Sequence, residues 1–95
     1  MNKREIKKAE RIEKLKKIVE GMPALLEFKC DGRWGNMESY YYPDEQKKRY
    51  YLFFEGEGFL VDSIDEAMIM PFIDGKSLSD VTKEIIIYNG QERVY

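Results

Sequence analysis

The stretch "YYYPDEQKKRYYLFF", residues 40–54, places a polar, proline-containing turn between two aromatic runs. This pattern predicts an antiparallel hairpin, because strand-forming residues flank residues that favour turns. Strand side chains alternate between faces, so Tyr50, Leu52 and Phe54 point one way while Tyr51 and Phe53 point the other. Both faces of the hairpin are therefore aromatic. Either the rest of the chain covers the second face, or an aromatic surface stays open.

Strand signals continue on both sides of this hairpin. "ALLEFKC" (24–30) leads into the turn-like "DGRWG" (31–35) and then "MESYYY" (37–42). After "RYYLFF" (49–54), the turn "EGEG" separates off a fourth short strand, "FLVD". Short strands with short connections predict a four-stranded antiparallel meander over residues 24–62.

Helices are predicted before and after the meander. Residues 3–20 are rich in helix formers, and Ile12, Leu15, Val19 and Met22 recur at helical spacing. Gly21 and Pro23 then end the predicted helix. Downstream, "SIDE" at 63–66 is a capping-box pattern for a short helix over 64–70, and a serine can cap a second helix over 78–84. "EIIIY-NG-QERVY" then predicts a final hairpin with a type I′ turn.

The expected fold is thus α+β, in one domain spanning residues 1–95. An N-terminal amphipathic helix (1–21) packs on the antiparallel meander (24–62), and two short helices and a C-terminal hairpin follow (63–95). A chain of 95 residues with 43% hydrophobic content matches a single small globular domain. We expect a cytoplasmic protein without a membrane partner, since no apolar run has the length of a membrane helix and Cys30 has no second cysteine to pair with. Richness in Lys, Ile, Tyr and Glu suggests a bacterial or phage origin.

Catalytic chemistry finds little support in the sequence. The chain has no histidine, which removes Ser-His and Cys-His catalysis and nearly all zinc sites. "GKS" at 75–77 fails as a phosphate loop, because Met70 stands where the first glycine is required. The carboxylates of Asp62, Asp65 and Glu66 are accounted for by the start of a helix, where acids are favourable. We expect a non-enzymatic protein without cofactor or metal, and a buried structural role for Cys30.

Charge is distributed unevenly along the chain. Residues 1–20 carry a net charge of +4 and the remainder −6. Lys3, Lys7, Arg11 and Lys14 form a basic ridge on the first helix, which is either a solvated face neutralised in part by Glu10–Lys14 and Glu13–Lys17 pairs or a contact for phosphates. The alternative hypothesis for function is therefore a single-stranded nucleic-acid-binding module, which combines this ridge with Lys47, Lys48, Arg49 and the hairpin aromatics.

The leading hypothesis is a protein-binding module, an inhibitor or adaptor that occupies another protein's surface. Tyrosine and tryptophan are enriched at interfaces, and an acidic body suits a basic protein better than a polyanion. The candidate anchors are Trp34, Tyr41, Tyr51 and Phe53. The candidate acids at the hairpin ends are Asp44, Glu45, Glu55 and Glu57. Self-association as a homodimer, through the same aromatics or an edge strand of the final hairpin, is a third hypothesis.

Overall fold

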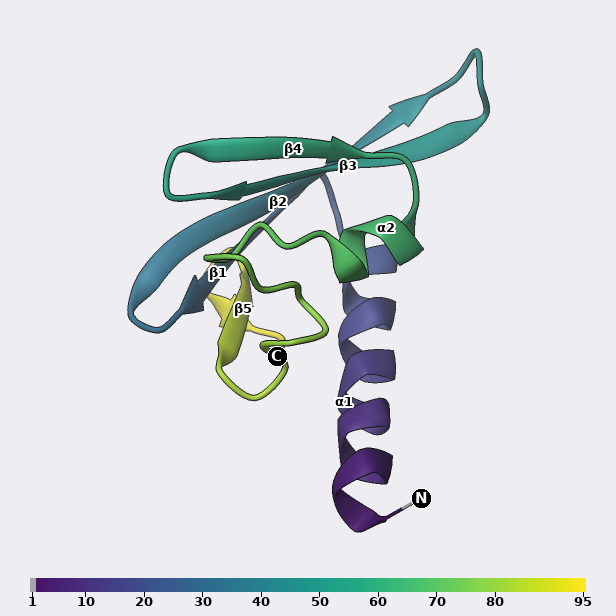
Figure 1. Cartoon of the computed structure of the whole chain (residues 1–95). Helices are drawn as coiled ribbons and strands as arrows, with labels where there is room; N and C mark the ends of the chain where they lie inside the picture. The colour runs from purple at the N-terminus through teal and green to yellow at the C-terminus, as the bar shows by residue number, and fades with distance from the viewer. Residues whose placement is uncertain (1) are drawn as a thin grey trace.

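The computed structural model describes residues 2–95 and confirms the α+β class, with an N-terminal helix and one six-stranded antiparallel sheet (Figure 1). The strand order is β4-β3-β2-β1-β5-β6, so the predicted meander forms and the final hairpin extends it beside β1. The elements are α1 (Lys3–Glu20), β1 (Leu25–Cys30), β2 (Arg33–Tyr42), β3 (Lys47–Phe54), β4 (Glu57–Val61), α2 (Ile64–Ile69), β5 (Ile85–Asn89) and β6 (Glu92–Arg93). Among the described residues, no helix has the length and apolarity needed to cross a membrane.

Tight turns set the register of the sheet. Asp31–Gly32 joins β1 to β2, and Glu55–Gly56 joins β3 to β4; all four residues have positive φ, as a type I′ turn requires. The final hairpin differs from the expectation. Asn89 pairs with Glu92, so the loop is Gly90–Gln91, and only Gly90 has a positive φ. The turn is therefore type II′ and not the predicted type I′, since glycine takes the first loop position.

β2 begins earlier than the sequence suggests. The turn after β1 uses only Asp31 and Gly32, and Arg33 already pairs with Cys30. Trp34, assigned to a turn from its place in "DGRWG", therefore lies within a strand, opposite Lys29. This correction fixes the direction of the indole ring relative to the sheet.

Residues 78–84 do not form the predicted helix. Their backbone makes successive turns, and the Asp80 carboxylate accepts hydrogen bonds from the Ser77 backbone N–H (2.9 Å) and hydroxyl (3.0 Å). These bonds hold the pKa of Asp80 below its usual value. The other short helix does form as α2, with Ser63 Oγ accepting from the Glu66 N–H at 3.1 Å.

One face of the sheet holds the core. Leu26, Phe28, Met37, Leu52 and Ile87 are all fully buried on it. The Phe28 ring stacks on Phe54 with centroids 5.9 Å apart and meets the edge of Phe72 at the same distance. α2 and the segment that follows it cover this face (Figure 1).

α1 packs on the core side of the sheet, but only through its second half. Its nearest regular element is α2, and no Cα atom of α1 comes within 8 Å of a strand Cα (Figure 1). Its second half buries Leu15 and Val19 in the core, and the Arg11 Nε donates to Thr82 Oγ1 at 3.3 Å. Residues 2–10 are all exposed. We call Lys3–Glu10 the projecting half of α1, because it extends beyond the body of the protein (Figure 1).

Two glycines of the sheet give a test of this packing. A Cβ on Gly35 would lie 2.3 Å from Phe28 Cζ and 2.6 Å from the Phe53 carbonyl oxygen. Since that oxygen belongs to the backbone of β3, Gly35→Ala should lower the free energy of unfolding by about 1–3 kcal/mol. Gly58→Ala is the control, because the three atoms nearest its Cβ belong to the half-buried rings of Phe53 and Tyr51 and none belongs to the backbone. Urea unfolding should show a clearly larger loss for Gly35→Ala; equal losses would contradict this packing.

Candidate functional site

The face of the sheet opposite the core is uncovered in the part of the chain that the structure describes. We call it the open face. The antiparallel register places on it nine apolar side chains from five strands, none of them buried: Leu25, Trp34, Tyr40, Tyr42, Tyr51, Phe53, Leu60, Ile86 and Tyr88. The second aromatic face of the hairpin is therefore left open by the rest of the described chain. α1, α2 and the segment between α2 and β5 all lie on the core side, and the final hairpin widens the sheet without covering it.

One stacked aromatic pair lies on the β3–β4 side of the open face. The rings of Tyr51 and Phe53 stack with centroids 4.5 Å apart and planes 14° from parallel. Both rings lean over Gly58 of the edge strand, whose missing side chain leaves the space they fill. Leu60, which pairs with Tyr51 and is 47% exposed, continues the apolar surface along β4.

A second aromatic pair lies on the β1–β5 side. Trp34 is 54% exposed, and its ring packs against Tyr88 with centroids 5.6 Å apart. The Lys29 ammonium sits 5.6 Å from the centre of the indole ring, within the range of a cation–π contact. The tryptophan is thus held from two sides while half of its surface faces solvent.

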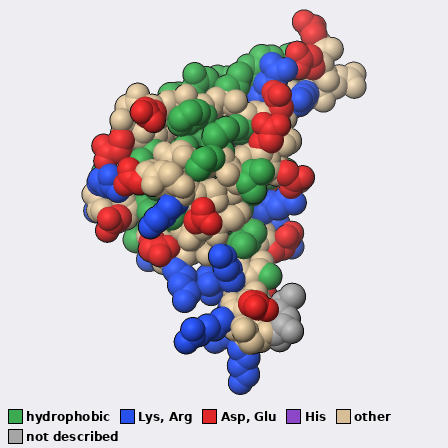
Figure 2. All heavy atoms as spheres, viewed as in Figure 1, with side chains coloured by type: hydrophobic (Ala, Val, Ile, Leu, Met, Phe, Trp, Pro, Cys, Tyr) green, Lys and Arg blue, Asp and Glu red, His purple; other side chains and the backbone are tan. Residues whose placement is uncertain are grey.

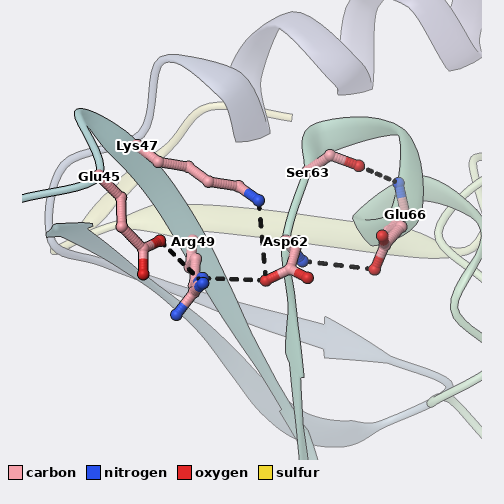
Figure 3. Close-up of polar contacts among 6 residues, drawn as sticks. All are labelled: Glu45, Lys47, Arg49, Asp62, Ser63 and Glu66. Carbon is pink, nitrogen blue, oxygen red and sulfur yellow. Dashed lines mark hydrogen bonds and ion pairs between the residues drawn. The ribbon is translucent and has the colours of Figure 1, made fainter.

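Ion pairs lie at one end of the open face, the end nearest the β2–β3 turn. Figure 3 shows Arg49 between Glu45 and Asp62, with Nη2 2.8 Å from Glu45 Oε2 and Nε 2.9 Å from Asp62 Oδ1. The Arg49 guanidinium also lies 4.7 Å from the centre of the Tyr42 ring. Lys47 Nζ is 4.0 Å from the same Asp62 oxygen. These contacts pair Lys47 and Arg49 with carboxylates of the same molecule, whereas Lys48 has no ion pair among residues 2–95.

The structure brings together three of the four predicted anchors. Trp34, Tyr51 and Phe53 share the open face. Tyr41 is opposite Lys48, on the same face of the sheet as the core residues. It lies near the tip of the β2–β3 hairpin, beyond the core, and is 63% exposed. Tyr41 therefore belongs to a different surface from the other three.

The predicted acids divide in a similar way. Glu45 pairs with Arg49, and Glu55 pairs with Arg33 at 3.2 Å. Arg33 also binds the Asp74 carboxylate, and this bond raises the pKa of the Arg33 guanidinium. Within residues 2–95, the other two acids, Asp44 and Glu57, form no ion pair. An unpaired carboxylate thus lies near each end of β3, but only two of the four predicted acids are unpaired.

The other titratable candidates have structural surroundings. Asp65 pairs with Lys16 at 3.0 Å, and a Glu66 oxygen accepts from the Asp62 N–H at 3.3 Å (Figure 3). Burial raises the pKa of the Cys30 thiol, as do the nearby carboxylates of Glu84 and Asp31. Among the described residues, no three His, Cys, Asp or Glu side chains gather as metal ligands would.

The two predicted basic sets lie at opposite ends of α1. The Lys48 ammonium donates to the Glu20 carbonyl at 3.2 Å, which places the β2–β3 hairpin at the C-terminal end of the helix. Lys3, Lys7 and Arg11 lie in its first half, about 15–25 Å away at 1.5 Å per residue. Figure 2 shows basic side chains gathered around the projecting half. Those cations and the hairpin aromatics therefore do not form one continuous surface.

Sequence reasoning missed the β1 and β5 contribution to the open face. Tyr88 contacts Trp34 across the intervening strand β1, and that neighbourhood depends on where the final hairpin joins the sheet. The sequence "IIIYN" shows no alternation of apolar and polar residues that would signal it; burial alternates only in the structure, where Ile85 and Ile87 are buried and Ile86 and Tyr88 are not. Alternation alone, however, does not reveal which strand lies alongside.

Comparison with protein-family models, with curated proteins and with solved structures found no match for this chain.

Proposed function

We propose that this protein is a non-enzymatic binding module that docks another protein on the open face of its sheet. The observation that carries the proposal is the exposure of preformed aromatic pairs, Trp34 with Tyr88 and Tyr51 with Phe53. Large uncovered apolar surfaces on small proteins mark interaction sites, and rings already held in place lose little conformational entropy on binding.

The composition of the open face supports a protein partner over nucleic acid. Aromatic residues and arginine are the types enriched at protein interfaces. The central rows of the face carry Glu27 and Glu38, and the Tyr40 hydroxyl donates to the Glu38 carboxylate. The cations Lys47 and Arg49 are already paired with Asp62. Lys29 and Arg93 also lie on the open face and form no ion pair within residues 2–95, so the preference for a protein partner rests on the aromatic content of the face and not on its charge.

The mechanism that follows is occupation of a partner's working surface, as an inhibitor or adaptor does. Trp34 and Phe53 supply buried area, and Asp44 in the β2–β3 turn steers a basic partner toward the face; Glu57 is opposite Phe54, on the core side of the sheet. Stable interfaces bury about 800 Å² on each partner, so the docked protein should cover the aromatic residues of β2, β3 and β5 together.

Trp34→Ala should abolish capture of the partner while Tyr41→Ala leaves it intact. Both side chains are exposed aromatics on β2, but only the indole lies on the open face. Truncation of an anchor residue costs about 2 kcal/mol or more, which is roughly a thirtyfold loss of affinity. The immobilised wild type and both variants are incubated with host-cell lysate, and retained proteins are quantified by mass spectrometry. A purified candidate is then titrated against all three.

The Tyr41→Ala control distinguishes docking on the open face from nonspecific binding. A protein retained equally by all three forms does not bind through the open face, and equal losses with Tyr41→Ala would place the interface at the hairpin tip. If no retained protein depends on Trp34, the proposal fails. The mass of the purified protein in solution is measured first, since a dimer that dissociates in Trp34→Ala would identify the partner as a second copy.

A further inference from the structure

The projecting half of α1 has an unusual continuation of the helix's buried face. Leu15 and Val19 face the core from the second half of the helix, and Met22, just beyond its end, is buried as well. Going back along the same helical face, at spacings of three and four residues, the next positions are Arg11, Lys8 and Arg4. The same face of α1 is therefore apolar in the half that packs on the protein and basic in the half that extends beyond it.

This overhang encloses a concave surface. A hollow of about 290 Å³ lies between α1 and the segment before β5, and Arg4, Lys7, Lys8 and Arg11 line it from the helix side. Lys83 lines it from the opposite side, together with the carboxylates of Asp80 and Glu84. The bond from Arg11 Nε to Thr82 Oγ1, 3.3 Å long, joins helix and segment at the hollow. We call this the basic hollow.

The cations of the basic hollow are not neutralised within the described residues. No ion pair there involves Lys7, Arg11 or any other Lys or Arg of the hollow, and the expected Glu10–Lys14 pair does not form. Asp80 accepts two hydrogen bonds from Ser77 and keeps its negative charge. Five cations thus face two carboxylates, which leaves a net charge of +3 in the lining.

The lining also selects a class of ligand. Every side chain in it is charged or polar, with no aromatic or aliphatic anchor of the kind a protein interface needs at its centre. No ring in the lining offers a stacking surface for an unpaired base. What the hollow presents is charge on a rigid helix, and this suits a dense row of phosphates.

From this geometry we propose that the basic hollow binds the phosphate backbone of double-stranded nucleic acid, without reading its sequence. Duplex DNA carries about one phosphate charge per 1.7 Å of helix axis, twice the density of either strand counted alone. The site is separate from the open face, so a protein partner and a duplex can be held together. It neither requires nor replaces the proposed protein-docking function.

The test measures binding of a short fluorescent DNA duplex of arbitrary sequence by anisotropy across a salt series. With five phosphate contacts, the slope of log K against log salt should lie near about −4 to −5. The double variant Arg4→Gln/Lys8→Gln should bind about 50-fold more weakly near 0.1 M salt and lose about two units of slope, since each contact contributes close to tenfold there. Both side chains are exposed, and equal thermal midpoints will confirm that the variant is folded.

Lys47→Gln/Lys48→Gln is the matched control, because it removes the same charge from the β2–β3 hairpin at the other end of α1. It should leave duplex affinity within about twofold of wild type. Equal loss in both double variants would overturn the site, since net charge or the hairpin would then explain binding. Failure to bind duplex at low salt, or tighter binding to single strands than to duplex, would overturn it as well.

Discussion

Phe28→Ala should lower the free energy of unfolding by about 3–5 kcal/mol, the range for removing a buried phenylalanine. Phe28 is fully buried in the central strand β1, between Phe54 and Phe72. It also packs over Gly35, which has no side chain where the ring lies. Alanine would leave a cavity touching three elements, which cannot collapse without moving the sheet. The total free energy of unfolding of a small domain is only about 5–15 kcal/mol, so the variant should be partly unfolded at moderate temperature.

Phe53→Ala is the matched comparison for that substitution. Phe53 lies on β3 and is half-buried against Tyr51 on the open face. Its loss removes one stacking contact and part of its apolar area, so we expect about 1 kcal/mol. Urea unfolding monitored by circular dichroism gives both values. If Phe53→Ala destabilises as strongly as Phe28→Ala, the open face is covered in solution, and the docking proposal loses its basis.

Turns and strand alternation are predictable from the sequence because their causes are local. Asp31–Gly32 and Glu55–Gly56 need positive φ at both positions, and glycine with a polar neighbour signals that need in the sequence. Period-two alternation likewise assigns Tyr51 and Phe53 to the face opposite Leu52, and the register of β2 with β3 agrees. The helix predicted over 3–20 spans Lys3–Glu20, because helix formers run unbroken up to Gly21.

The segment 78–84 is wrongly predicted as a helix because serine and aspartate have two uses. Both cap helices, and both bond to nearby backbone in turns that compete with a helix. Here Asp80 accepts from the Ser77 backbone N–H and hydroxyl, which stabilises a turn, and the chain proceeds directly to β5. The local sequence does not distinguish these outcomes.

The open face and the basic hollow depend on placement over long sequence distances. No short stretch around Trp34 specifies that Tyr88 will pack on it, or that α1 and α2 will both lie on the core side. In the same way, Lys83 is unremarkable in the sequence, and only the docking of α1 brings it opposite Arg4 and Lys8. Which residues form a surface is therefore harder to predict than which way each one points.

The docking of α1 rests on very few side chains, and this makes Leu15 the second critical position. Leu15 is fully buried, whereas residues 2–10 make no buried contact. Leu15→Ala should lower the free energy of unfolding by about 2–4 kcal/mol, within the range for buried leucines. Ile6→Ala, on the projecting half, should change it by no more than about 0.5 kcal/mol, because Ile6 is 43% exposed. Urea unfolding of both variants measures the difference. A large loss with Ile6→Ala would mean that the projecting half packs on the protein in solution, and the basic hollow beneath it would then be closed.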